Sequence, residues 1–190
     1  MSREDPFVVR EYRVLWTCNS PSPYNDFLFA SIHADSRFNL QVVYHRTEIE
    51  SHPWLDQFGS GYPWIAPRPL SLFRELRKTA RLDNKALYVI GGWRDSTSLL
   101  TLLFAMSGRY RFVIWTDTPN VERQRNRLLG LFRKLWLSMV LSRAEAVLGT
   151  GMPALAALSS MGVSQDKLVN FPYWVPISRR PVRSARDQEG

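Results

Sequence analysis

The sequence has one cysteine, Cys18, and lacks the short motifs that mark many well-known enzyme sites. A single cysteine cannot form an internal disulfide, which excludes a secreted fold held together by disulfides. Neither G-x-G-x-x-G nor G-x-x-x-x-G-K-[ST] is present, so a dinucleotide-binding or P-loop enzyme is disfavoured, and no G-x-S-x-G elbow is found. The spacing of His33, His45 and His52 is not typical of a metal site, and no metal is predicted.

Long apolar runs are also missing. The longest fall well short of the roughly 20 residues that cross a bilayer. The opening MSREDPF carries acids and no apolar run, so no signal peptide is expected and a cytoplasmic location is the default.

Acidic residues are fewer than basic ones: 17 Asp and Glu against 25 Lys and Arg give a formal net charge of +8. Such a charge attracts nucleic acid, anionic lipid or phosphorylated ligands. No Lys/Arg tract interleaved with glycine occurs, which disfavours a specific nucleic-acid partner.

Hydrophobic residues make up 45% of the chain, enough for one packed domain. Short apolar runs predict strands at 12–17, 40–44, 86–90, 112–116, 146–149 and 168–171. Helical patterns lie between them, near 23–35, 70–81, 96–107, 119–142 and 153–161. This alternation predicts a single α/β Rossmann-like domain with a mostly parallel sheet of about six strands and helices on both faces. We expect the domain to span residues 1–173 and to be followed by a basic linker or tail at 174–190.

Ligands of open parallel sheets bind where strands end and helices begin. This rule points to the loops at 19–24, 46–68, 91–95, 117–120 and 150–152. The second of these is rich in proline, glycine and aromatic residues and is unusually long for a compact domain, which favours a functional loop.

Candidate sugar-binding residues lie in these loops, and each has a structural alternative. Asn19 and Tyr24 either present polar groups to a ligand or belong to a rigid proline turn. Gly91 and Gly92 allow a ligand to approach the backbone closely, and Trp93 can stack on a sugar ring. The alternative is a tight turn over a buried indole.

Asp117 follows a strand that ends at Thr116, and it is the candidate catalytic residue. Its carboxylate can accept hydrogen bonds from sugar hydroxyls or act as a base. The alternative for Asp117, and also for Asp95, is to cap the helix that follows. Thr116 and Asp95 are retained as sugar-binding candidates. Thr150 and Gly151, in a partial glycine loop, complete that set.

The helix predicted from Pro119 combines apolar and basic residues. Its apolar face consists of Leu128, Phe132, Leu135, Trp136 and Met139 and is widened by Leu129, Leu131 and Val140. Arg123, Arg127 and Lys134 lie opposite. Such a helix packs on a sheet, or rests on anionic lipid. Together with an arginine-rich tail, this pattern leaves a non-catalytic membrane-associated or scaffolding module as the alternative to an enzyme.

Several segments, read in order, resemble one family. A strand followed by Pro21-Ser22-Pro23-Tyr24, and then a helix that runs into Phe38-Asn39-Leu40-Gln41-Val42, is similar to the opening of glycosyltransferase family 4-like N-terminal domains. Residues 143–151 resemble the later helix, strand and loop of that family. Residues 162–173 resemble its approach to the interdomain linker, and the likeness spans residues 12–176 in all.

The resemblance implies the N-terminal half of a GT-B glycosyltransferase, in which two Rossmann-like domains face each other across a cleft. It implies that this half receives a glycan or lipid-linked acceptor. The nucleotide-sugar donor would be a co-substrate, no other cofactor is expected, and the family's Glu-x7-Glu pattern is absent. The expected partner is therefore a donor-binding GT-B C-terminal domain, in cis or in trans. An anionic membrane surface is the further partner that the basic helix suggests, with a peripheral location at the inner face of the membrane.

Overall fold

The computed structural model describes residues 12–47, 61–119 and 127–173, without the side chains of 127–133. Within these ranges, seven parallel strands form one sheet in the order β3-β2-β1-β4-β5-β6-β7. The strands are β1 (Tyr12–Cys18), β2 (Phe38–Tyr44), β3 (Trp64–Ile65), β4 (Leu87–Gly91), β5 (Phe112–Thr116), β6 (Ala146–Gly149) and β7 (Leu168–Asn170). The predicted α/β class is confirmed. The strand beyond the six predicted ones is β3, a two-residue edge strand that pairs with β2.

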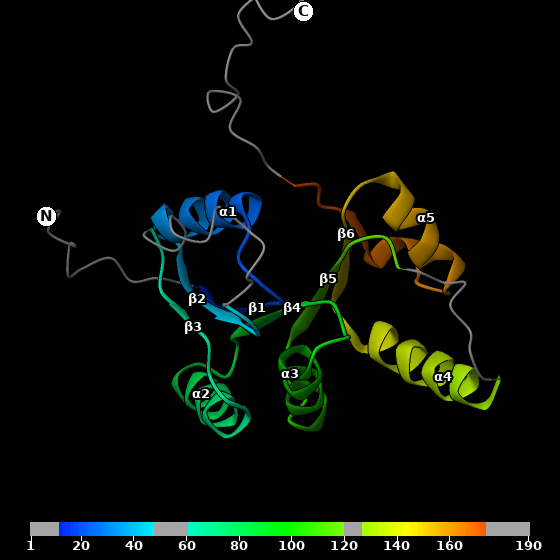
Figure 1. Cartoon of the computed structure of the whole chain (residues 1–190), viewed down its shortest axis with the longest axis horizontal. Helices are drawn as coiled ribbons and strands as arrows, with labels where there is room; N and C mark the ends of the chain where they lie inside the picture. The colour runs from blue at the N-terminus through cyan, green and yellow to red at the C-terminus, as the bar shows by residue number, and fades with distance from the viewer. Residues whose placement is uncertain (1–11, 48–60, 120–126, 174–190) are drawn as a thin grey trace, which may run out of the picture.

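Five α-helices cover the two faces of the sheet in the described part of the chain (Figure 1). They are α1 (Pro23–Ala34), α2 (Pro69–Leu82), α3 (Ser96–Ser107), α4 (Arg127–Arg143) and α5 (Met152–Ser160). Helices α1 and α5 lie on one face, and α2, α3 and α4 lie on the other. The predicted helices agree closely with these bounds except for the fourth. Pro119 is not helical, α4 is helical from Arg127 onward, and residues 120–126 lie outside the described ranges.

The helix starts and stops follow from local chemistry. The Ser22 side chain caps α1 by accepting a hydrogen bond from the Asn25 backbone N–H at 3.3 Å, and Pro23 supplies a first-turn residue with a fixed φ. Beyond α5 the chain turns at Gly162, whose φ of +89° is the left-handed conformation that glycine adopts readily.

Alternation along each strand produces a core on either side of the sheet. Leu15 and Ile114 point toward α2, α3 and α4, where Leu102 packs with them. Trp16 points the other way and meets Phe29 of α1, with ring centroids 5.2 Å apart. Because both faces are buried, the strands are fixed, and the loops at their carboxyl ends are held in place.

The buried face of α4 differs in part from the predicted one. Val140, at the edge of the predicted face, is buried as expected. Leu137 and Leu141, which lie outside that face, are also buried, whereas Leu135 and Met139 remain 59% and 44% exposed. The helix carries two apolar stripes, and its contacts with the sheet and α3 determine which one is covered. Periodicity alone cannot make that choice. The predicted basic tail, residues 174–190, lies outside the described residues.

The predicted functional loop 46–68 is described only in part, because residues 48–60 lie outside the structure's described ranges. Tyr62 is buried in the core beside α1, with its hydroxyl oxygen 2.8 Å from that of Tyr44. Trp64 belongs to β3. The described end of this loop therefore contributes to the fold. No helix in the described ranges is long and apolar enough to cross a membrane.

Candidate functional site

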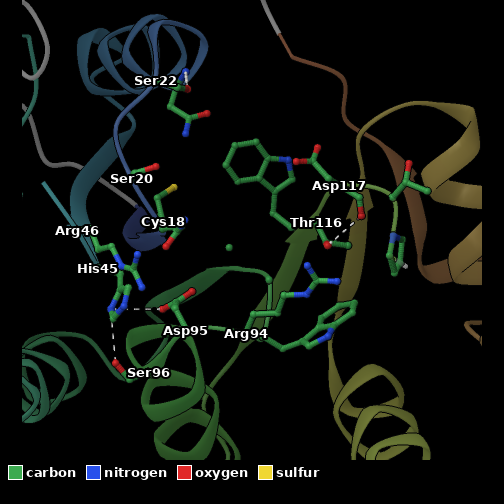
Figure 2. Close-up of a pocket in the computed structure, with 18 of the residues that line it drawn as sticks. Cys18, Ser20, Ser22, His45, Arg46, Arg94, Asp95, Ser96, Thr116 and Asp117 are labelled. Carbon is green, nitrogen blue, oxygen red and sulfur yellow. Dashed lines mark hydrogen bonds and ion pairs between the residues drawn. The ribbon is translucent and has the colours of Figure 1, made fainter. Parts of the chain in front are cut away.

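A cleft of about 680 Å³ opens at the carboxyl ends of β1, β2, β4 and β5 (Figure 2). The chain builds the sheet outward from β1 to β3, and then returns to place β4 on the other side of β1. The loops after β1 and β4 therefore diverge, and this is where open α/β sheets bind ligands. The lining residues are Cys18, Asn19, Ser20, Ser22, Asn25, His45, Arg46, Gly91, Gly92, Trp93, Arg94, Asp95, Ser96, Trp115, Thr116, Asp117, Thr118, Pro119 and Tyr173.

Two glycines form the floor between β1 and β4. A Cβ on Gly91 would lie 2.5 Å from the Thr17 carbonyl oxygen, so no larger residue fits there without moving the backbone. Gly92 has a φ of +78°, and its N–H donates to the Trp115 carbonyl at 2.8 Å. The backbone therefore requires glycine at both positions. Because neither residue has a side chain, both also leave space at the bottom of the cleft. Trp93 lines the cleft and packs partly on the core beneath it.

Asp95 is the N-cap of α3. Its Oδ1 accepts from the Ser98 backbone N–H at 2.8 Å, and its Oδ2 accepts from the Ser98 hydroxyl at 2.9 Å. His45 lies beside it, with Nδ1 4.0 Å from Asp95 Oδ1 (Figure 2). The same nitrogen is 3.1 Å from Thr97 Oγ1. The capping alternative for Asp95 is thus confirmed, and its carboxylate also faces an imidazole in the cleft.

Asp117 lies on the wall opposite Asp95, after β5. Its carboxylate accepts from the Tyr173 hydroxyl at 2.9 and 3.0 Å and from Thr150 Oγ1 at 2.5 Å. Burial raises the pKa of Tyr173, and the bond to Asp117 shifts it the same way, so the phenol stays protonated as a donor. The structure describes α4 from Arg127 onward, and within the described residues no hydrogen bond joins Asp117 to that helix.

The charged side chains of the cleft differ in whether they have partners within the protein. Arg46 and Arg94 are exposed, and neither has a carboxylate within ion-pair distance in the described ranges. The two carboxylates, by contrast, already accept hydrogen bonds from protein groups. Burial raises the pKa of the Cys18 thiol, with Asp95 contributing less, so Cys18 is a neutral thiol rather than a nucleophile.

Seven of the ten predicted site residues line this one cleft, namely Asn19, Gly91, Gly92, Trp93, Asp95, Thr116 and Asp117. Three do not. Tyr24 stands next to the cleft, with its ring 5.5 Å from that of Tyr173. The Thr150 hydroxyl donates to the Asp117 carboxylate, and Gly151 is the N-cap of α5. The structure brings these residues together without testing whether they bind a sugar, so their assignment stays a prediction.

Sequence reasoning missed several lining residues. His45 directly follows β2 and lies one residue before the nominated loop 46–68, and Arg46 is the first residue of that loop, but neither was singled out. Arg94 lies inside a nominated loop. Tyr173 carried no signal, because it reaches Asp117 only through the return of the chain after β7. Within the described residues, no group of three or more His, Cys, Asp or Glu is placed to hold a metal ion.

Comparisons with known proteins support the fold. No family model matches the chain, and no curated protein matches it. The structure is similar to that of MnaA of S. aureus solved with UDP, with 13% identity and a TM-score of 0.54, covering 83% of this chain and 43% of that one. An O-GlcNAc transferase mutant of Thermobaculum terrenum aligns at 14% identity and a TM-score of 0.39, covering 92% and 47% of the two chains. The first likeness shows an open Rossmann-like α/β fold. The second is too weak to carry an argument. The chain spans less than half the length of either protein.

Proposed function

We propose that this chain is the acceptor-binding N-terminal domain of a GT-B glycosyltransferase of the family 4-like type. It transfers sugar from a nucleotide-sugar donor to a glycan or lipid-linked acceptor when a donor-binding domain is supplied in cis or in trans. The observation that carries the proposal is the cleft at the divergence of β1 and β4, which gathers polar loops from four strands. The ordered family-like segments in the sequence support it independently.

The chemistry of the lining suits a hydroxylated ligand. Sugar hydroxyls need donors and acceptors at close range, and the cleft offers both on Asn19, Ser20 and Thr116. Trp93 and Trp115 provide apolar surface of the kind on which sugar rings stack. Sugar-diphosphate and phosphate groups are anionic, and guanidinium groups bind such oxygens in a bidentate manner.

Asp117 is the proposed catalytic residue. Two hydroxyls hold its carboxylate in one orientation, and a carboxylate has about four acceptor sites, so capacity remains for an acceptor hydroxyl. In the transfer step the acceptor oxygen forms a bond to the anomeric carbon, the bond from that carbon to the nucleoside diphosphate breaks, and the Asp117 carboxylate takes the hydroxyl proton. A carboxylate at the acceptor oxygen orients that hydroxyl and stabilises the positive charge that develops there.

The test is transfer of labelled sugar from a panel of nucleotide sugars by the purified chain, alone and with a donor-domain protein. Transfer is expected only with the donor domain. Asp117→Asn should then lower kcat by roughly a hundredfold or more, whereas Asp166→Asn, an exposed carboxylate outside the cleft, should not. Robust sugar transfer by the chain alone would refute the proposal that it needs a donor-binding domain.

A non-catalytic module is the second candidate. The observation that favours it is that Asp117 is already bonded by Tyr173 and Thr150, which is also what a purely structural carboxylate would show. In that case Asp117→Asn lowers stability and no donor domain elicits transfer. The same assay, run with a urea denaturation curve for each variant, separates the two candidates.

A further inference from the structure

The two helical layers differ sharply in charge. On one face of the sheet, α2 and α4 together contain eight Lys and Arg residues, four in each helix. They are Arg74, Arg77, Lys78, Arg81, Arg127, Arg133, Lys134 and Arg143. The only acidic residue within α2, α3 and α4 is Glu75, which lies 3.8 Å from Lys78. On the opposite face, α1 and α5 contain no Lys or Arg at all. The described helices therefore give the domain one strongly basic side.

The basic side also exposes apolar side chains. Leu70 and Phe73, in the first turns of α2, are 87% and 51% exposed. Leu99 and Leu103, one helical turn apart on α3, are 40% and 46% exposed. The Phe73 ring meets Phe104 of α3 edge-on, with centroids 5.7 Å apart, so α2 and α3 are joined at this point. These residues and the four basic residues of α2 are called the α2–α3 surface below.

The position of these apolar residues is set by the fold. A helix between parallel strands runs back against them, so its N-terminus lies at the carboxyl edge of the sheet, where the cleft opens. Leu70 and Phe73 occupy the first turns of α2, and Leu99 the first turn of α3. The apolar part of the surface therefore lies at the cleft edge, and Lys78 and Arg81 lie farther from it.

We propose that the α2–α3 surface docks on an anionic membrane with the cleft edge toward the lipid, and that the acceptor is consequently lipid-linked. The second half of this inference rests on the proposed function, and the first half does not. Apolar side chains enter the acyl boundary while arginines and lysines meet anionic headgroups, which is how amphipathic helices bind a bilayer surface.

Charge and polarity select this occupant over others. A second copy of the chain would bring like charges together at the surface, which opposes association. Nucleic acid would satisfy the basic residues but would leave Leu70 and Phe73 in water. An anionic bilayer meets both demands at once. The cation–π contact of Arg77 with the Phe73 ring, at 5.8 Å, keeps a basic and an apolar group side by side.

The test is co-sedimentation of the full chain with vesicles of equal parts phosphatidylglycerol and phosphatidylcholine, and with phosphatidylcholine alone. Binding is expected only with the anionic vesicles and should weaken as salt is added. Each basic residue near the membrane changes partitioning by about fivefold, so replacing the two α2 arginines nearest the cleft edge, Arg74→Gln/Arg77→Gln, should lower it by roughly 25-fold at low salt. Leu70→Ser removes an exposed side chain without touching the core, and it should also weaken binding.

A charge-matched control uses the opposite edge of the sheet. Arg37 and Arg111 precede β2 and β5 and form exposed ion pairs with Asp35 and Glu145. Arg37→Gln/Arg111→Gln removes the same net charge and should leave binding within about twofold of the unaltered chain. Circular dichroism of each variant establishes that it is folded.

Three results would overturn the docking. The first is that the chain does not sediment with anionic vesicles at low salt. The second is that the α2 double variant and its control lose vesicle binding equally. The third is that the α2 variant binds vesicles normally while Arg179→Gln/Arg180→Gln abolishes vesicle binding. Preference for duplex DNA over vesicles would assign the surface to nucleic acid instead.

The inference that the acceptor is lipid-linked is tested by sugar transfer, with the donor domain, to a lipid-linked acceptor in vesicles and to its water-soluble analogue. Docking without any transfer would refute the proposed function and leave the docking standing. Transfer to the soluble analogue alone would refute the lipid-linked acceptor.

Discussion

Replacing Asp95 with alanine is expected to destabilise the domain because it removes the cap of α3. Both carboxylate oxygens bond to Ser98, through its N–H at 2.8 Å and its hydroxyl at 2.9 Å, and Ser98 is fully buried. Loss of an N-cap costs about 1–2 kcal/mol, and a buried N–H left without a partner costs roughly 1–3 kcal/mol. These two figures describe largely the same event, so we expect about 2 kcal/mol for Asp95→Ala.

The matched variant is Asp95→Asn, which keeps an oxygen at the cap and removes only the charge. It should cost about 0.5 kcal/mol, since Asn caps helices nearly as well as Asp. Equilibrium unfolding in urea measures both, and with a slope of about 2 kcal/mol/M the Asp95→Ala midpoint should fall by about 1 M. Equal losses in the two variants would show that the charge facing His45 matters rather than the cap. An unchanged midpoint in Asp95→Ala would refute the capping argument altogether.

Three further predictions concern buried side chains. Burial raises the pKa of Tyr88, so above about pH 10 the unfolded chain loses a proton that the native chain keeps, and the urea midpoint should fall there, less so in Tyr88→Phe. Burial also raises the pKa of the Cys18 thiol, and a thiol reagent at pH 8 should modify the native chain about a hundredfold more slowly than the urea-unfolded chain. Leu102→Ala should cost about 3 kcal/mol in urea unfolding, whereas Leu103→Ala on the exposed side of the same helix should cost within about 0.5 kcal/mol.

The strands and helices of this domain were largely predictable because their signals are local. Strands buried on both faces produce continuous apolar runs, as in Phe112–Thr116, and caps such as Ser22 and Asp95 mark the helix starts. The edge strand β3 was not predicted, since its two residues are a strand only by virtue of pairing with Val42 and Val43 of β2. The predicted buried face of α4 was wrong in part for a related reason. Both apolar stripes of the helix fit a 3.6-residue period, so periodicity could not place Leu137 and Leu141 in the core.

The location of the cleft was predictable, and the partners of its side chains were not. The rule for parallel sheets selects loops, and the loops after β1, β4 and β5 do line the cleft. Which atoms meet depends on contacts between distant positions. His45 reaches Thr97 across 52 positions, and Tyr173 reaches Asp117 across 56. No local pattern encodes either contact.

The groups that hold the fold can be separated from those that do not. Asp95 caps α3, Gly91 permits the close approach of β4 to β1, and Asp117 is tied to Tyr173. Substitutions at these positions change the structure as well as any binding, so their effects on ligand affinity are ambiguous. Arg46 and Arg94 line the same cleft from the loops after β2 and β4, and in the described ranges neither has a carboxylate partner. Because their removal leaves the caps and strand contacts intact, a loss of affinity at these two positions would report on the ligand itself.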